Sequence, residues 1–255
     1  MRIRVINPNT TESMTALIEA SARAVAGPGT VVDAVTPSMG PASIESHYDE
    51  ALAVPGVLAA IADGERSGVD GYVLACFGDP GLDAARELAR GPVVGIAEAA
   101  MHAATFVGRG FSVVTTLSRT AGRAHDLAAR YVAAGACRGV HACEIPVLEL
   151  ESDPTVRKRV AEVSRAALDR DGSDVIVLGC AGLADLAAAV SADLGVPVID
   201  GVGAATVLVE SMVTLGLATS RRSEYARPPV KAYTGLLEEF SVVRPAGPRA
   251  SPYPG

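Results

Sequence analysis

The two halves of the chain repeat one pattern of residues. Residues 70–82 (DGYVLACFGDPGL) align with residues 174–186 (DVIVLGCAGLADL) at a constant offset of 104, which matches Cys76 with Cys180. Two shorter segments repeat at similar offsets: residues 92–96 with 197–201, and residues 5–10 with 113–118. Units of strand, helix and strand resemble one another in general, but here the cysteine match comes with matched flanks on both sides. We interpret the repeat as two copies of one small lobe related by a pseudo-two-fold axis.

Short apolar runs alternate with helical patterns along the chain. Strands are expected at residues 2–6, 31–35, 70–75, 92–96, 111–115, 139–145, 174–179 and 196–199. Helices are expected at residues 12–26, 48–67, 82–90, 97–108, 120–134, 154–170, 183–194 and 202–216. Strands that are apolar on both faces and alternate with helices form parallel sheets. The sequence therefore predicts an α/β fold of two similar lobes, each with a parallel sheet flanked by helices.

The boundaries of the lobes follow from the repeat. We expect residues 1–97 plus about 205–235 in the first lobe and residues 98–204 in the second. Residues 241–255 contain four prolines, so we expect a disordered tail there. Ligands of open parallel sheets bind beyond the carboxyl ends of the strands. An active site in the cleft between the lobes is therefore expected, with Cys76 and Cys180 facing each other.

Composition narrows the class of protein. Of 255 residues 49% are hydrophobic, which is ample for a core, and the net charge of −7 leaves no basic surface for nucleic acid. Aromatic residues are only 4%, which argues against stacking on bases or sugars. No apolar run reaches about 18 residues, so we expect no membrane partner. The N-terminus does not resemble a signal peptide, which predicts a cytoplasmic protein with thiols rather than disulfides.

Two opposed thiols have several possible uses. A redox disulfide favours a CxxC spacing, and a zinc site needs HxH, HExxH or CxxC patterns; the sequence has none of these. A single nucleophilic cysteine with a histidine partner leaves the duplication unexplained. A pair of acid–base groups on opposite faces of one carbon explains it, because inverting a stereocentre removes a proton from one face and returns one to the other.

The thiols need activation for this chemistry, because at a pKa near 8.5 only about 3% is thiolate at pH 7. Each cysteine lies between a predicted strand and a predicted helix, so we expect backbone N–H groups and the helix dipole to lower its pKa. Asp79 could contact substrate, cap a helix or tune a pKa. Cys137, near a predicted helix end, and Cys143, in a predicted strand, have no partner in the other half and are interpreted as structural.

Seven motifs carry a resemblance to a known family. They are INPNT (6–10), GPASIE (40–45), ACFGDPG (75–81), GIAEAA (95–100), SVVTTL (112–117), VLGCAG (177–182) and GVPVIDG (195–201). With these motifs in this order, the chain resembles the hydantoin and allantoin racemases of the aspartate/glutamate racemase superfamily from about residue 2 to residue 235. One departure is Leu183, where relatives often carry Met.

The resemblance implies a site. Cys76 and Cys180 would be the catalytic acid–base residues, with no cofactor and no metal. The substrate ring would lie between them, held by a set of turn and loop residues: Pro8, Asn9, Ser43, Ile44, Thr115, Thr116 and the N–H groups of Gly78 and Gly182. Read without the resemblance, Asn9 and Ser43 could equally serve only their own turns. The family also implies a homo-oligomer, a tetramer or a hexamer.

The favoured hypothesis is a cofactor-independent racemase of 5-monosubstituted hydantoins, including allantoin, that moves the proton on C5 between two cysteines. Other superfamily activities stay open: an amino-acid racemase, a maleate isomerase-type enzyme or an arylmalonate decarboxylase-type enzyme. A two-lobed binding protein without turnover is a further alternative, and a thiol-redox role is the least favoured. The 5-substituent is left open, because the sequence alone does not show the pocket lining.

Overall fold

Two parallel β-sheets of four strands each organise the computed structural model, which describes residues 1–241. The first sheet has the order β2-β1-β3-β4 and the second the order β6-β5-β7-β8, so the two follow the same path. The first comprises β1 (Arg2–Ile6), β2 (Val31–Val35), β3 (Gly71–Leu74) and β4 (Val93–Gly95). The second comprises β5 (Phe111–Thr115), β6 (Cys137–Ala142), β7 (Val175–Leu178) and β8 (Val198–Ile199). The predicted fold class of two similar α/β lobes is confirmed.

The internal repeat extends to strand register. In the first sheet Ile3 pairs with Gly71, and in the second sheet Phe111 pairs with Val175. Phe111 lies 108 residues after Ile3, and Val175 lies 104 residues after Gly71, so the pairs match at the offsets of the sequence repeat. These central strands are buried on both faces, as their continuous apolar sequences require. Equal register brings Cys76 and Cys180 to the same edge of their respective sheets.

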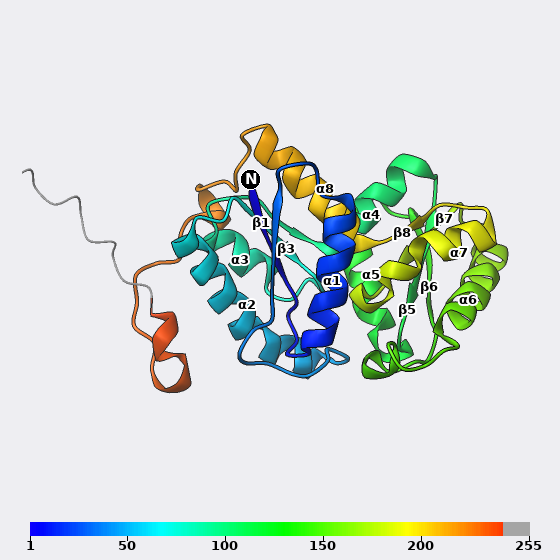
Figure 1. Cartoon of the computed structure of the whole chain (residues 1–255), viewed down its shortest axis with the longest axis horizontal. Coiled ribbons are helices and arrows are strands. Elements are labelled where there is room, and N and C mark those ends of the chain that lie inside the picture. Colours follow the sequence, from blue (N-terminus) through cyan, green and yellow to red (C-terminus); the bar gives the residue numbers. More distant parts are fainter. Residues whose placement is uncertain (242–255) are drawn as a thin grey trace, which may run out of the picture.

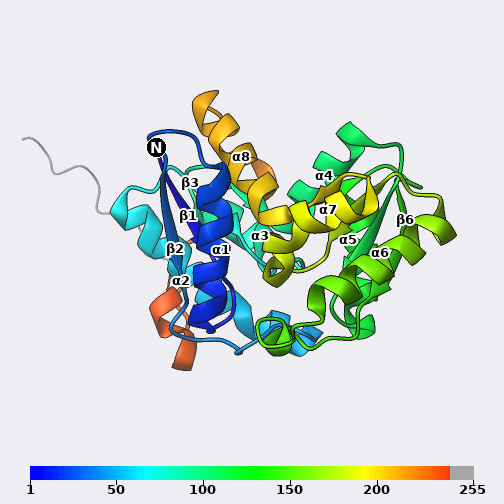
Figure 2. The same cartoon turned by 45° about the vertical axis from the view of Figure 1, so that its right-hand side comes forward.

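Helices cover both faces of each sheet (Figures 1 and 2). The first lobe has α1 (Glu12–Val25) and α8 (Gly201–Thr214) on one face, and α2 (His47–Ser67) and α3 (Leu82–Leu88) on the other. The second lobe has α4 (Ile96–Val107) and α5 (Ala121–Tyr131) on one face, and α6 (Val156–Asp171) and α7 (Ala187–Leu194) on the other.

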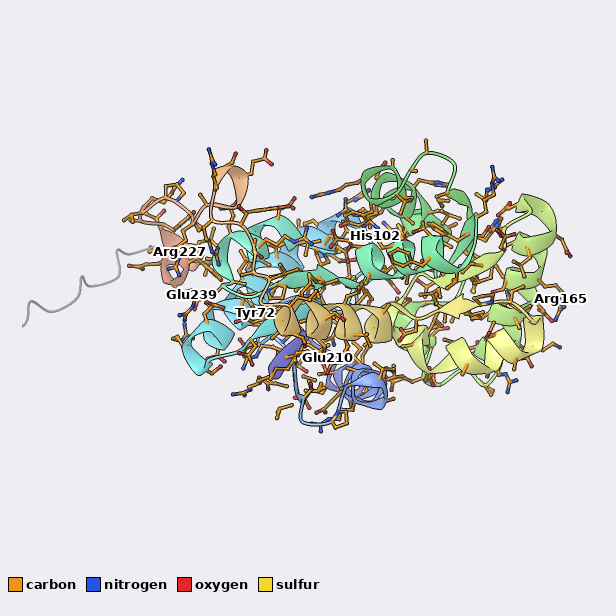
Figure 3. The ribbon with its side chains drawn as sticks, turned by 90° about the horizontal axis from the view of Figure 1, so that it is seen from above. Tyr72, His102, Arg165, Glu210, Arg227 and Glu239 are labelled. Atoms are coloured by element: carbon orange, nitrogen blue, oxygen red, sulfur yellow. The ribbon has the colours of Figure 1, made fainter. Side chains whose placement is uncertain are left out.

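The helix that follows the last strand of each sheet packs on the other sheet. α4 follows β4 but packs on β7, while α8 follows β8 but packs on β3, and α4 and α8 contact each other where the lobes meet (Figure 1). Glu210 of α8 points toward α1 (Figure 3) and accepts a hydrogen bond of 2.9 Å from the backbone N–H of Gly27, just beyond α1. This exchange of helices links the lobes through buried apolar contacts. The predicted boundaries at residues 97 and 205 stay predictions.

Some element ends differ from those expected. The helix predicted at residues 183–194 is a 3-10 helix, η3 (Ala181–Leu186), followed by α7. The strand predicted at residues 139–145 is β6, which begins at Cys137 and ends before Cys143. An irregularity in the pairing between Phe111 and Ser112 accompanies this shift. Residues 242–255, which hold nearly all of the predicted tail, lie outside the described part of the chain.

Candidate functional site

Cys76 and Cys180 line the same pocket at the carboxyl ends of the two sheets. Cys76 lies two residues after β3 and Cys180 two residues after β7, so each lobe contributes one thiol. The two sulfur atoms are close enough for charge on Cys180 to raise the pKa of Cys76. All four cysteines are free thiols. The structure therefore brings together the two residues that the repeat singled out.

Each thiol has the same backbone neighbour. The N–H group of Gly78 lies near the sulfur of Cys76 and acts to lower its pKa, and the N–H group of Gly182 does the same for Cys180. Both glycines lie two residues after their cysteine. Such donors stabilise a thiolate, and they can also stabilise a negative charge that develops on a bound molecule.

The prediction of lowered thiol pKa values is wrong. Burial raises the pKa of Cys76 to about 12 and that of Cys180 to about 11, and it outweighs the backbone N–H groups. Nearby carboxylates act in the same direction: Glu50 and Asp79 on Cys76, and Glu45 on Cys180. Neither cysteine leads directly into an α-helix, since α3 begins at Leu82 and Cys180 leads into a 3-10 helix. Neither thiol therefore lies in the first turn of the α-helix whose dipole the sequence prediction assumed.

Asp79 is buried in the loop after Cys76 and caps α4, not its own helix. Its two carboxylate oxygens accept hydrogen bonds of 3.1 Å from the N–H groups of Ala97 and Glu98. A side chain on Gly95 would collide with this carboxylate, so glycine is required there. Burial raises the pKa of Asp79 to about 7. Of the three roles considered for Asp79, the structure shows two: it caps α4, which links the Cys76 loop to the helix on the second sheet, and its charge raises the pKa of Cys76.

The other predicted site residues divide into two groups. The residues that line the pocket are Asn9, Ile44, Gly78, Thr115 and Thr116. The residues outside the lining are Pro8, Ser43 and Gly182. The N–H group of Gly182 nevertheless lies beside Cys180.

The Asn9 side chain is held within its own turn. Its Oδ1 accepts from Asn7 Nδ2 and from the N–H group of Thr11, both at 2.9 Å. Thr115 Oγ1 donates to the carbonyl of Gly179 at 3.2 Å, a hydrogen bond that links β5 to the residue before Cys180.

Sequence reasoning missed several residues of the pocket. Met14, Phe77, Ala124 and Val147 add apolar wall, and Glu50 and Arg123 add charge. Arg123 Nη2 donates to the carbonyl of Gly78 at 2.8 Å, and Arg123 Nε lies 3.5 Å from Glu50 Oε1. Both residues belong to helices, where a charged residue usually indicates a solvated face, so no local signal distinguished them.

Further contacts cross between the lobes around the pocket. Glu45 Oε1 accepts a hydrogen bond of 2.7 Å from the N–H group of Val147. Arg130 of α5 donates to both carboxylate oxygens of Asp83 on α3 at 2.8 and 2.9 Å. With the Asp79 cap, these contacts hold the two cysteine loops in one arrangement.

Residues 1–241 contain neither a cluster of metal-ligating side chains nor a membrane-spanning helix. None of their His, Cys, Asp and Glu side chains form a group of three that could hold a metal ion. Within the same range, every helix is too short or too polar to cross a membrane.

Comparison with known proteins gives consistent matches. The family model described as Asp/Glu/Hydantoin racemase matches residues 3–209. A hydantoin racemase from Rhizobium meliloti is 48% identical over 92% of this chain and 98% of its own length. Among solved structures, an allantoin racemase from Klebsiella pneumoniae is 54% identical with a TM-score of 0.92, covering 94% of this chain and 99% of its own. An allantoin racemase from Pseudomonas fluorescens is 40% identical with a TM-score of 0.89, covering 92% and 100%.

Removal of the Asp79 cap is expected to destabilise the protein, and to do so more at low pH than at high pH. We expect D79A to lower the free energy of unfolding by about 1–2 kcal/mol at pH 5.5, the usual cost of removing a helix cap. The folded-state pKa of Asp79 is raised, so its contribution is lost as pH rises through about 7, and the difference from the wild type should narrow at pH 8. Denaturant unfolding at both pH values measures this.

D83A is the matched control, because Asp83 is a half-exposed carboxylate with an exposed Arg130 partner. We expect it to cost less than about 1 kcal/mol. A D79A variant as stable as the wild type at pH 5.5 would contradict the capping role, whereas a loss that grows toward pH 8 would contradict the raised pKa of Asp79.

Proposed function

The chain belongs to the Asp/Glu/hydantoin racemase family, and we propose that it racemises 5-monosubstituted hydantoins, allantoin among them, by proton transfer at C5 between Cys76 and Cys180. The observation that carries the proposal is the placement of two thiols, one from each copy of the repeat, in one pocket. The names of the relatives support the reaction: those compared above are hydantoin and allantoin racemases.

The chemistry requires a base and an acid on opposite faces of C5. C5 of the hydantoin ring lies between a carbonyl carbon and a ring nitrogen, so removal of the proton from C5 gives an enolate. One cysteine, as thiolate, accepts the C5 proton and becomes a thiol. The other cysteine, as thiol, donates its proton to the opposite face and becomes the thiolate. The exchange of roles leaves the enzyme ready for the opposite enantiomer, which suits a pseudo-symmetric site.

The raised pKa values of the thiols define the resting state. At neutral pH both cysteines are protonated in almost every unliganded molecule, because burial disfavours the thiolate. The reactive form has lost one proton from the pair, and the two titrations are coupled. The N–H groups of Gly78 and Gly182 act on this form by stabilising whichever sulfur is ionised.

We propose that the substrate ring is held by residues from both lobes. Asn9, Ile44, Thr115 and Thr116 line the pocket and are placed for direct contact. Pro8 and Ser43 lie outside the lining, so we propose that they support the adjoining turns. The groups of this chain suffice for proton transfer, and the proposed reaction uses no metal or cofactor. A cytoplasmic homo-oligomer, as a tetramer or hexamer, also stays a proposal.

Removal of either thiol tests the mechanism. We expect C76A and C180A each to lower the rate of racemisation by about 10²- to 10⁴-fold, the usual contribution of one general acid or base. Polarimetry with optically pure allantoin and 5-benzylhydantoin measures the rate. C137A and C143A are matched controls and should retain wild-type rates, because neither residue lines the pocket. Near wild-type racemisation by C76A or C180A would overturn the two-thiol mechanism.

The rate should also rise with pH. Between pH 6 and pH 8 both pKa values lie above the range, so the singly ionised pair increases about tenfold per pH unit, and kcat/KM should increase with a slope near one. The ring imide stays largely protonated in this window. Reactions without enzyme correct for spontaneous racemisation. The D79N variant lacks the titrating carboxyl group and shows how much of the pH dependence comes from Asp79. A profile that is already flat at pH 7 would show that a thiolate forms near neutrality.

A further inference from the structure

Glu50 and Arg123 form a charged pair in the wall of the pocket. Among the described residues that line it, these two alone carry charge. Glu50 comes from α2 of the first lobe and Arg123 from α5 of the second, so the pair spans the two halves of the site. Both side chains are partly exposed, at 20% and 33%, which places them toward the solvent side of the pocket.

Both members of the pair are positioned by contacts with Gly78. Arg123 is anchored by the hydrogen bond from its Nη2 to the carbonyl of Gly78. Glu50 packs over the same residue, and a side chain at position 78 would collide with its Oε1. Gly78 therefore sets the positions of both charged groups as well as placing its N–H group near Cys76.

The guanidinium has an unused donor. Among residues 1–241, the buried Arg123 Nε has no hydrogen-bond partner, because the Glu50 Oε1 atom at 3.5 Å is too far and too poorly aligned to accept from it. A buried N–H group without a partner is unfavourable, so the guanidinium is stabilised when it turns this group toward an acceptor on a bound molecule. Next to this donor, the Glu50 carboxylate offers an acceptor.

A donor beside an acceptor matches the edge of an amide or urea group, which presents C=O next to N–H. A hydantoin has such an edge on its ring, and allantoin has a second in its ureido substituent. The ring must place C5 between the enclosed thiols, whereas the charged pair lies toward solvent, where the substituent has room to vary. We propose that Glu50 and Arg123 bind the 5-substituent and select a ureido group over an apolar one; this inference rests on the proposed racemase function.

The consequence is a preference for substrates with a ureido group over substrates with an apolar 5-substituent. Arg123 would donate to the ureido carbonyl, and Glu50 would accept from the ureido N–H groups. An apolar substituent such as benzyl would desolvate both charges and offer no acceptor to Arg123 Nε, which is unfavourable. The wild type should therefore have a higher kcat/KM with allantoin than with 5-benzylhydantoin or 5-isopropylhydantoin.

The test compares R123M and E50Q with the wild type on optically pure allantoin and 5-benzylhydantoin. We expect each variant to lower the ratio of kcat/KM for allantoin to that for 5-benzylhydantoin by about 10- to 100-fold, the range for hydrogen bonds to charged groups. The change should fall mainly on KM, because the contact does not touch the reacting atoms. R119M is the matched control, since Arg119 is an exposed arginine four residues before Arg123 and outside the pocket lining.

The outcomes separate this inference from the function on which it rests. An unchanged ratio with both substrates impaired would show that the pair binds the ring or only supports the fold, and it would overturn the inference while leaving the racemase intact. A wild type that prefers 5-benzylhydantoin would overturn it as well. A wild type inactive on every hydantoin would instead refute the proposed function. If R123M does not fold, E50Q measures the same ratio alone.

Discussion

The reciprocal packing of α4 and α8 is the interaction on which the site depends. Each helix follows the last strand of one sheet and packs on the other, so neither lobe completes its own covering layer. The two sheets are thereby held with their carboxyl edges toward a common pocket. Asp79 reinforces this arrangement, because it ties the Cys76 loop to the first turn of α4. Two thiols on separate loops can face one carbon only if the lobes hold this relation.

Burial sets the chemical character of the pair. A thiol enclosed by protein resists ionisation, and the backbone N–H groups offset only part of that cost. The two thiols at the centre of the resting site are therefore uncharged, and among the described residues that line the pocket Glu50 and Arg123 carry the charge. This arrangement suits transfer of a single proton, since a protonated donor is always available and a thiolate, once formed, is a strong base.

The sequence predicted the fold well because the repeat and the strand pattern are long-range and redundant. Cys76 and Cys180 could be singled out since their flanks match on both sides. The direction of their pKa shifts could not be predicted, because it depends on enclosure by the opposite lobe and on a five-residue loop between Cys76 and α3. The sequence did not predict Glu50 and Arg123 as site residues for the same reason. Each lies on a helix, and only the approach of the two lobes turns them into pocket residues.

Isotope labelling tests the central claim of two thiols on opposite faces most directly. A single enantiomer of the hydantoin is converted in D₂O, and both enantiomers are separated and analysed for deuterium at C5 during the first few per cent of conversion. The account predicts that the product carries deuterium while the recovered starting enantiomer keeps its proton, whichever enantiomer is used. Equal labelling of both enantiomers from the start would show that one group serves both faces, and would contradict the account.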